Sequence, residues 1–154
     1  MRLFGVPAVA LGLTLAGLVP LAAGAGVMWA ARADAVLQMQ AAQALIVYGA
    51  LILSFLGGVR WGAEVNGQGA GIPRTPLISL SVLGSLAGFG IVLWALWSVE
   101  LWPVLAALAG AHLLHGVWDA GGAGLPIWMR RLRGFAAVVA VIALGAAAAS
   151  YFVR

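Results

Sequence analysis

Uncharged, apolar stretches separated by short polar segments dominate the pattern along the chain. Residues 3–31, 35–59, 75–99, 101–118 and 134–153 contain no Asp, Glu, Lys or Arg. Each stretch is near or above the roughly 20 residues that a helix needs to cross about 30 Å of hydrocarbon. Backbone polar groups inside a bilayer must be satisfied within their own segment, which favours helices. The pattern predicts five transmembrane helices, near residues 5–28, 35–59, 76–98, 102–118 and 134–153.

Residues that begin or interrupt helices lie near the ends of these stretches. Asp34 precedes the second stretch, where its side chain can accept hydrogen bonds from the first backbone N–H groups of a helix. Pro76 and Pro103 fall in the first turns of the third and fourth helices, where a missing N–H costs nothing. We expect the first helix to begin near Pro7 and to bend or end near Pro20.

The composition supports a membrane protein made of one all-α domain over residues 1–154. Of these residues, 64% are hydrophobic and 8% are charged, whereas soluble domains contain about 25% charged residues. The chain contains no cysteine, which excludes disulfides, thiolate nucleophiles and cysteine metal sites. Its eight arginines form no basic stripe, so we expect no nucleic-acid partner.

The first apolar stretch also resembles a secretory signal peptide. Arg2 precedes an apolar run that is followed by small residues. The apolar core of a signal peptide is about 7–15 residues long. Here the run continues to Trp29, which favours a retained membrane span.

The arginines are distributed unevenly between the two sides that five crossings create. One side carries six of them and the other side carries two. Positive residues concentrate on the cytoplasmic side of membrane proteins. We therefore expect a cytoplasmic N-terminus and a periplasmic or extracellular C-terminus. The cytoplasmic set is Arg2, Arg60, Arg74, Arg130, Arg131 and Arg133, and the opposite set is Arg32 and Arg154.

Two sequence blocks carry a family resemblance. These blocks are YGALILSFLGGVRWG at residues 48–62 and LPIWMRRLRG at residues 125–134, with Asp119 before the second. Together they resemble a domain of unknown function shared by small bacterial proteins and mitochondrial transmembrane protein 69. Met129 stands where that family tends to have an aromatic residue. The resemblance implies a polytopic inner-membrane protein without an established reaction. Richness in Ala, Gly and Arg is typical of a GC-rich genome and favours the bacterial inner membrane.

Several polar and aromatic residues should gather on the cytoplasmic side. As a binding site they would hold an anionic phospholipid or a small anion, because arginine presents a planar fork suited to phosphate. As a structural cluster they would tie the inner loops together, which is the interpretation we favour. Arg60, expected at the end of the second helix, should pair with Asp119, with Arg133 competing for that carboxylate. The residues are Arg60, Trp61, Glu64, Asp119, Trp128 and Arg133.

Two histidines lie on the same predicted helix as Asp119. His112, His115 and Asp119 are spaced three and four residues apart, so they share one helix face. Ionisable groups inside a membrane are candidates for handling protons or ions. Structural or interfacial roles are the simpler interpretation. Metal binding would need further ligands, and we expect no metal and no cofactor.

Small residues mark the third and fourth predicted helices. Gly84 and Gly88 form a GxxxG pattern, and Ala106 and Gly110 form its counterpart in the next helix. Small residues let membrane helices pack closely. We expect these faces to pack the two helices together within the chain. The alternative is a contact with a second copy or with another membrane protein.

A glycine-rich loop and a basic segment precede the last helix. Gly121, Gly122 and Gly124 form a flexible loop and not a phosphate cradle, since no Gly-Lys-Ser/Thr follows. Residues 127–133 mix apolar and basic side chains, which predicts a short helix in the interface, attracted to anionic lipid.

The sequence predicts no enzyme, because no serine–histidine–acid arrangement and no pair of carboxylates stands out. The favoured function is an accessory or assembly-type protein of the lipid bilayer that acts through helix and loop contacts. The alternative is a small transporter, or a protein that binds anionic lipid or a small anion through the inner cluster of arginine and aspartate.

Overall fold

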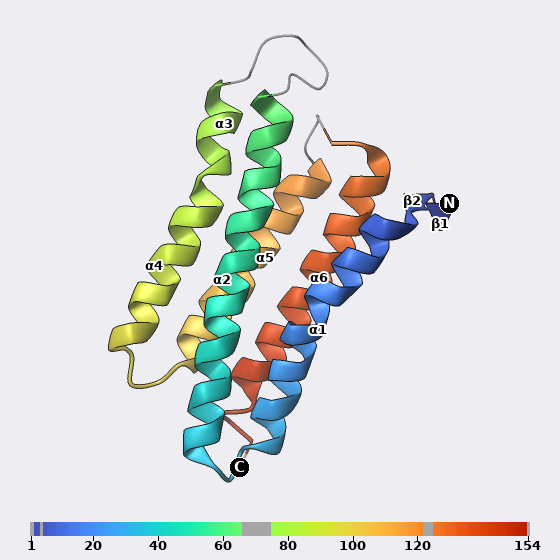
Figure 1. Ribbon diagram of the computed structural model, residues 1–154. Coiled ribbons are helices and arrows are strands. Elements are labelled where there is room, and N and C mark those ends of the chain that lie inside the picture. The colour runs from blue at the N-terminus through green and yellow to red at the C-terminus, as the bar shows by residue number, and fades with distance from the viewer. Residues whose placement is uncertain (1, 4, 66–74, 122–124, 154) are drawn as a thin grey trace.

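The chain folds into a bundle of long helices (Figure 1). The computed structural model describes residues 2–3, 5–65, 75–121 and 125–153. Two short strands pair antiparallel near the N-terminus, β1 (Arg2–Leu3) and β2 (Val6–Pro7), and between them Gly5 has a φ of 78°. The helices are α1 (Ala8–Ala30), α2 (Ala35–Val65), α3 (Thr75–Ser81), α4 (Leu83–Trp97), α5 (Trp102–Gly121) and α6 (Ile127–Ala149).

Four helices of the described chain are long and apolar enough to cross a membrane. They are Ala8–Ala30, Ala35–Val65, Leu77–Trp97 and Ile127–Ala149. The third of these spans includes most of α3 and all of α4, which meet at Val82. The remaining long helix, α5, carries His112, His115 and Asp119 and lies outside this set. The all-α bundle is confirmed, with four helices whose length and composition fit a membrane protein, and the fifth crossing stays a prediction.

Most helix beginnings agree with the sequence signals. The carboxylate of Asp34 accepts hydrogen bonds from the backbone N–H groups of Val36 and Leu37, at 3.1 and 3.0 Å. α1 begins directly after Pro7, and α5 places Pro103 in its first turn. The first helix does not end at Pro20, because α1 continues through this residue to Ala30. The expected helix end at Pro20 is therefore wrong.

The expected boundaries around the arginines are wrong. α2 continues to Val65, so Arg60 lies inside the helix and not at its end. Residues 127–133 are not a separate interfacial helix, because they form the first two turns of α6. α6 ends at Ala149, before the expected end at residue 153. We expected each helix to end at its first charged residue. In the structure the buried charges pair with one another, so α2 and α6 continue through them.

α2 occupies the middle of the bundle. It contacts α1, α4, α5 and α6, and α6 also lies beside α1 and α5 (Figure 1). Gly84 and Gly88 of α4 allow close approach to α2. A Cβ at Gly84 would lie 2.9 Å from the backbone oxygen of Leu53, and one at Gly88 would lie 2.9 Å from that of Ala50. The GxxxG face therefore packs within the chain, against α2.

The small residues of α5 do not take part in this packing. Ala106 is exposed, and a Cβ added at Gly110 would lie more than 4 Å from the side chains and from the other helices of the described residues. The expected match between the small-residue faces of α4 and α5 is therefore wrong. Small residues permit a close approach by any backbone, and the longer α2 takes this position beside α4.

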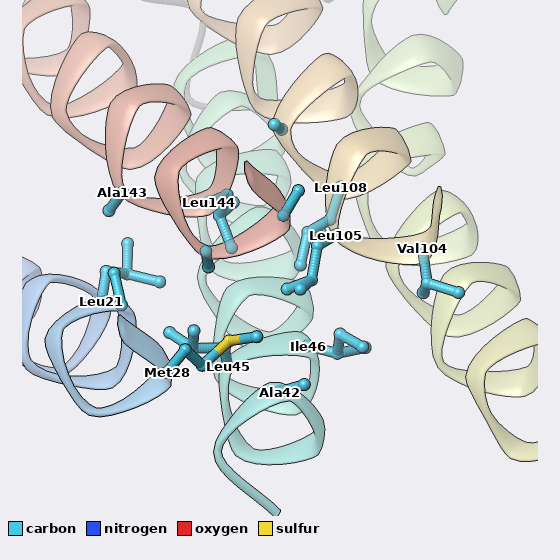
Figure 2. Close-up of a cluster of buried hydrophobic side chains, with 14 of the residues drawn as sticks. Leu21, Met28, Ala42, Leu45, Ile46, Val104, Leu105, Leu108, Ala143 and Leu144 are labelled. Carbon is cyan, nitrogen blue, oxygen red and sulfur yellow. The ribbon is translucent and has the colours of Figure 1, made fainter. Parts of the chain in front are cut away.

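A hydrophobic core lies toward one end of the bundle, where α1 ends and α2 begins. Leu21, Met28, Leu45, Leu105 and Leu144 are almost completely buried there (Figure 2). We call this region the apolar end. The opposite end, formed by residues 56–65 of α2, 115–121 of α5 and 127–133 of α6, is called the arginine end.

Candidate functional site

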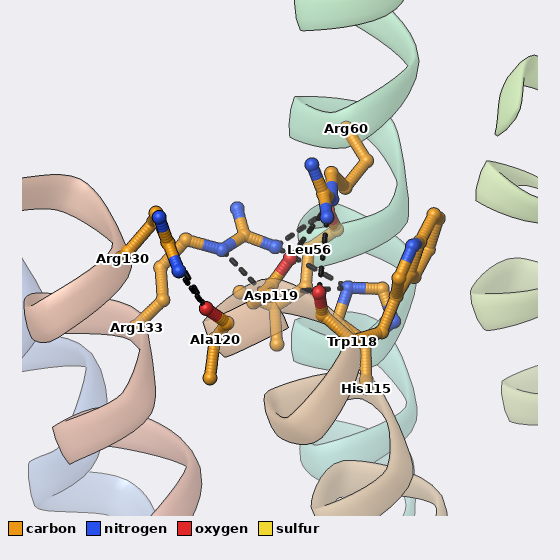
Figure 3. A network of polar contacts seen from close by, with 8 residues as sticks. All are labelled: Leu56, Arg60, His115, Trp118, Asp119, Ala120, Arg130 and Arg133. Carbon is orange, nitrogen blue, oxygen red and sulfur yellow. Dashed lines mark hydrogen bonds and ion pairs between the residues drawn. The ribbon is translucent and has the colours of Figure 1, made fainter. Parts of the chain in front are cut away.

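Arg60 is the largest of the side chains that are almost fully buried at the arginine end. Its residue is only 1% exposed. Its Nε lies 3.1 Å from Oδ1 of Asp119, and its Nη2 donates to the backbone oxygen of Trp118 at 3.1 Å (Figure 3). The guanidinium also stands over the Trp118 ring, 4.7 Å from the ring centre. α2 and α5 are thus joined by one side chain.

Arg133 approaches the same carboxylate from α6. Its Nε donates to Oδ2 of Asp119 at 2.5 Å, and its Nη2 donates to the backbone oxygen of Leu56 at 2.9 Å (Figure 3). Asp119 is 1% exposed. Each of its oxygens therefore faces one arginine, and three helices meet at a single carboxylate.

The expected pair of Arg60 and Asp119 is confirmed, and Arg133 joins the pair without replacing Arg60. A carboxylate has several lone-pair positions, so two guanidinium groups can bind it together. Asp119 lies in the last turn of α5, where the helix dipole disfavours a negative charge. Two cations offset that cost.

The structure separates the two histidines. Nε2 of His115 lies 3.2 Å from Nη2 of Arg133 and 3.7 Å from Oδ2 of Asp119. Arginine only donates, so this nitrogen accepts and the proton of a neutral His115 ring is on Nδ1. His112 lies one turn deeper, where its Nε2 donates to the backbone oxygen of Gly49 at 3.0 Å. Within the described residues no hydrogen bond connects the two rings, so they form no direct relay.

Comparison with known protein families shows which family the sequence of this chain matches. Residues 6–149 match the model of a family described as a protein of unknown function, DUF3429. The chain belongs to this family. No curated protein and no solved structure matches it significantly. The family description assigns no molecular function to this DUF3429 protein, so its function must be inferred from its structure.

The block around residues 55–62 shows how this DUF3429 protein brings its arginine end together. Gly57 faces the junction of α3 and α4, where an added Cβ would clash with the backbone oxygen of Ser81 and come within 3.8 Å of Gly84 Cα. Gly58 and Gly62 have open space beside them. Of these three glycines, Gly57 therefore makes the close approach between helices, about one turn before Arg60.

The other predicted cluster residues have different positions. Glu64 is buried, one turn beyond Arg60 on α2. Trp61 is 48% exposed on the outside of the bundle, and Trp128 is partly buried in the first turn of α6. Arg130 was not expected at the site, yet its Nε and Nη2 both donate to the backbone oxygen of Ala120, which caps α5. In the sequence, only the basic character of residues 127–133 indicated that Arg130 lies at this end of the bundle.

The charges of the cluster balance formally. Arg60 and Arg133 contribute two positive charges, and Glu64 and Asp119 contribute two negative charges. Both arginines already bind Asp119, which leaves no open anion site between them. Among the described residues no three His, Asp or Glu side chains gather as metal ligands. The arrangement is suited to joining helices.

Proposed function

We propose that the chain crosses a bacterial inner membrane five times. The position of α5 supports the fifth crossing. α4 ends at the apolar end of the bundle and α6 begins at the arginine end (Figure 1). If both helices cross, the helix between them must run from one side of the membrane to the other. α5 has 20 residues, about the length required.

The proposed orientation has a cytoplasmic N-terminus and a periplasmic or extracellular C-terminus. Arg60, Arg130, Arg131 and Arg133 all belong to the arginine end. Positive residues concentrate on the cytoplasmic side, which supports a cytoplasmic arginine end. Arg2, Arg74 and Arg154 lie on segments whose side chains are outside the described residues.

A reporter fused after Arg154 tests this topology. An enzyme that is active only outside the cytoplasm should be active in this fusion. A second fusion, in the connection between α2 and α3, should be inactive and serves as the control. Cytoplasmic behaviour of the first fusion on an intact chain would contradict either the five crossings or the orientation.

The function that the geometry supports best is that of an accessory or assembly-type protein, without catalysis. The observation that carries it is the closed charge cluster: its arginines and its aspartate bind one another, and Arg60 and Asp119 are each 1% exposed. Such a site stabilises an architecture and keeps its shared carboxylate, Asp119, closed to a substrate. Action through contacts is then the remaining route, and the exposed Trp61 and Arg131 at the arginine end are suited to it.

Copurification from native membranes tests this function. The tagged chain, expressed at its natural level and extracted in a mild detergent, should retain a membrane-protein partner at a fixed ratio. The double variant Trp61→Ala, Arg131→Gln should lose that partner. Trp97→Ala is the matched control, because Trp97 is 78% exposed at the C-terminal end of α4, which lies on the side of the apolar end. A chain that purifies alone, or equal loss in the double variant and the control, would contradict the proposal.

The second candidate is a small transporter or a protein that binds anionic lipid or a small anion. The cluster itself argues against a free anion, which would have to displace Asp119 from two buried arginines. A neighbouring cavity favours lipid, because Arg133 and Trp128 belong to its wall.

A further inference from the structure

An apolar groove lies between α1, α2 and α6. It encloses a cavity of about 340 Å³, within the size range of ligand pockets. Leucine, alanine and aromatic side chains make up most of its wall, and Thr14, His112 and Arg133 are its polar members. The N-terminal half of α1 diverges from α2 in this region (Figure 1). We call this cavity the arginine-end groove.

The length of the groove fits one leaflet of a bilayer. Along α1 the wall runs from Ala10 to Leu21, and along α6 it runs from Trp128 to Ala140. At 1.5 Å per residue these distances are about 17 and 18 Å. Half of a hydrocarbon layer of roughly 30 Å is about 15 Å. The groove therefore begins at the arginine end and reaches about the middle of the membrane.

Arg133 places a positive charge on the groove wall, in the half nearer the arginine end. This residue is 8% exposed, and its hydrogen bonds to Asp119, Leu56 and His115 use only Nε and Nη2. Nη1 has no hydrogen-bond partner among the described residues and points away from Asp119 (Figure 3). A guanidinium N–H that is accessible from the groove and has no partner among the described residues favours an anionic acceptor such as a phosphate oxygen.

We propose that the groove binds one acyl chain of an anionic phospholipid from the leaflet at the arginine end. The chain lies along α1 and α6, and the phosphate accepts a hydrogen bond from Nη1 of Arg133. Charge favours this occupant: Arg130 and Arg131 precede Arg133 on α6, whereas Asp119 is already bound. The binding site depends on membrane insertion and not on the proposed partner protein.

Headgroup selection separates a binding site from ordinary contact with lipid, because any groove that faces hydrocarbon fills with lipid. The full chain in nonionic detergent is given an equal mixture of phosphatidylglycerol and phosphatidylcholine with identical acyl chains. Native mass spectrometry then counts the retained lipids. Both lipids carry a phosphate that can accept from Nη1, so selection depends on the choline cation, which the arginines repel. We expect one phosphatidylglycerol per chain and about a tenfold preference over phosphatidylcholine, because only phosphatidylglycerol has a net negative charge.

Two matched pairs of variants test the groove. Thr14→Trp fills it from α1, whereas Ala16→Trp adds the same ring to an exposed position of that helix. Ala136→Trp fills it from α6, with the exposed Val138→Trp as its control. The groove variants should lose the retained phosphatidylglycerol and the controls should keep it. The second pair decides the question if Thr14→Trp fails to fold.

The headgroup contact has its own variant. Arg133→Lys keeps a positive charge beside Asp119 but removes the Nη1 donor, so the contact with the phosphate is lost and less lipid of either kind should be retained. Equal retention of the two lipids by the wild-type chain would overturn the proposal. Displacement of the lipid by millimolar inorganic phosphate would also overturn it, because the tail would then not contribute. Partner copurification is measured in separate samples, so either proposal can fail while the other stands.

Discussion

The two ends of the bundle are held together by different physics. At the apolar end, Leu21, Met28 and Leu144 are completely buried, and Trp29 donates from Nε1 to the backbone oxygen of Ala146 at 2.8 Å. At the arginine end, α2, α5 and α6 are joined by charges around Asp119, and α1 takes no part in these ion pairs. Small and branched side chains close the first region, whereas the second contains an open groove.

This difference shows why a membrane bundle uses both kinds of contact. Lipid tails are as apolar as leucine, so burying leucine between helices has no hydrophobic driving force and depends on close packing. Close packing at the apolar end leaves little room for a ligand. At the arginine end the ion pairs join α2, α5 and α6 but not α1, and the divergence of α1 from α2 leaves room for the groove.

Removal of the shared carboxylate should have the largest effect. Asp119→Asn leaves Arg60 and Arg133 buried without a negative partner between them. Breaking a buried ion pair costs about 3–5 kcal/mol, because the remaining charge is uncompensated. The free energy of unfolding, measured by adding SDS to the chain in mild micelles, should fall by that amount. Glu100→Gln is the control, since Glu100 is exposed. Equal effects of the two variants would mean that the cluster does not stabilise the arginine end.

The sequence predicted the members of this cluster better than it predicted their helices. Positive-inside counting and the helix dipole placed Arg60, Asp119 and Arg133 on one side. Helix boundaries drawn at the first charge failed at residues 59 and 134, because the charges lie inside α2 and α6. A single chain does not reveal which charges neutralise one another, and that decides whether a helix can continue through them.

The apolar end should respond to a cavity. Leu144 of α6 has no exposed surface and packs in the main core. Leu144→Ala should lower the free energy of unfolding by about 2–5 kcal/mol, the usual range for leucine to alanine in a core. Leu96→Ala is the matched control, because Leu96 is 70% exposed on α4. If the apolar end were loosely packed, both substitutions would cost the same.

The contact between α2 and α4 spans the distance between the two ends and should be sensitive to added volume. A side chain at Gly88 would meet the backbone of Ala50, which cannot move aside without shifting α2. Gly88→Leu should therefore destabilise the bundle in the same SDS titration by about 1–3 kcal/mol. Gly90→Leu is its control, since Gly90 has open space beside it. If Gly88→Leu did not lower the free energy of unfolding, α4 would be free to shift against α2.

Small-residue patterns predicted close packing but not the helices that make it. Gly84 and Gly88 pack against α2, whereas Ala106 of α5 is exposed and Gly110 has open space beside it among the described residues. A GxxxG pattern describes one surface only, and its partner depends on helix length and on the other contacts of the bundle. The groove was also not predictable, because it results from the divergence of α1 from α2 and not from any local motif.

The junction between the two regions should show the smallest effect and the most specific one. The hydroxyl of Tyr48 donates to the backbone oxygen of Gly17 at 2.7 Å, and Gly17 belongs to the groove wall. This bond ties α1 to α2 where the groove approaches the apolar core. Tyr48→Phe should lower the free energy of unfolding by only about 1 kcal/mol. The more informative result is the retained lipid: without this bond α1 should hold the acyl chain less firmly, so phosphatidylglycerol should dissociate at a lower collision energy.

Tyr151→Phe is the matched control, because the Tyr151 hydroxyl has no hydrogen-bond partner among the described residues. If Tyr48→Phe lowered the free energy of unfolding without changing lipid retention, this hydrogen bond would stabilise only the apolar end and would not contribute to lipid binding in the groove.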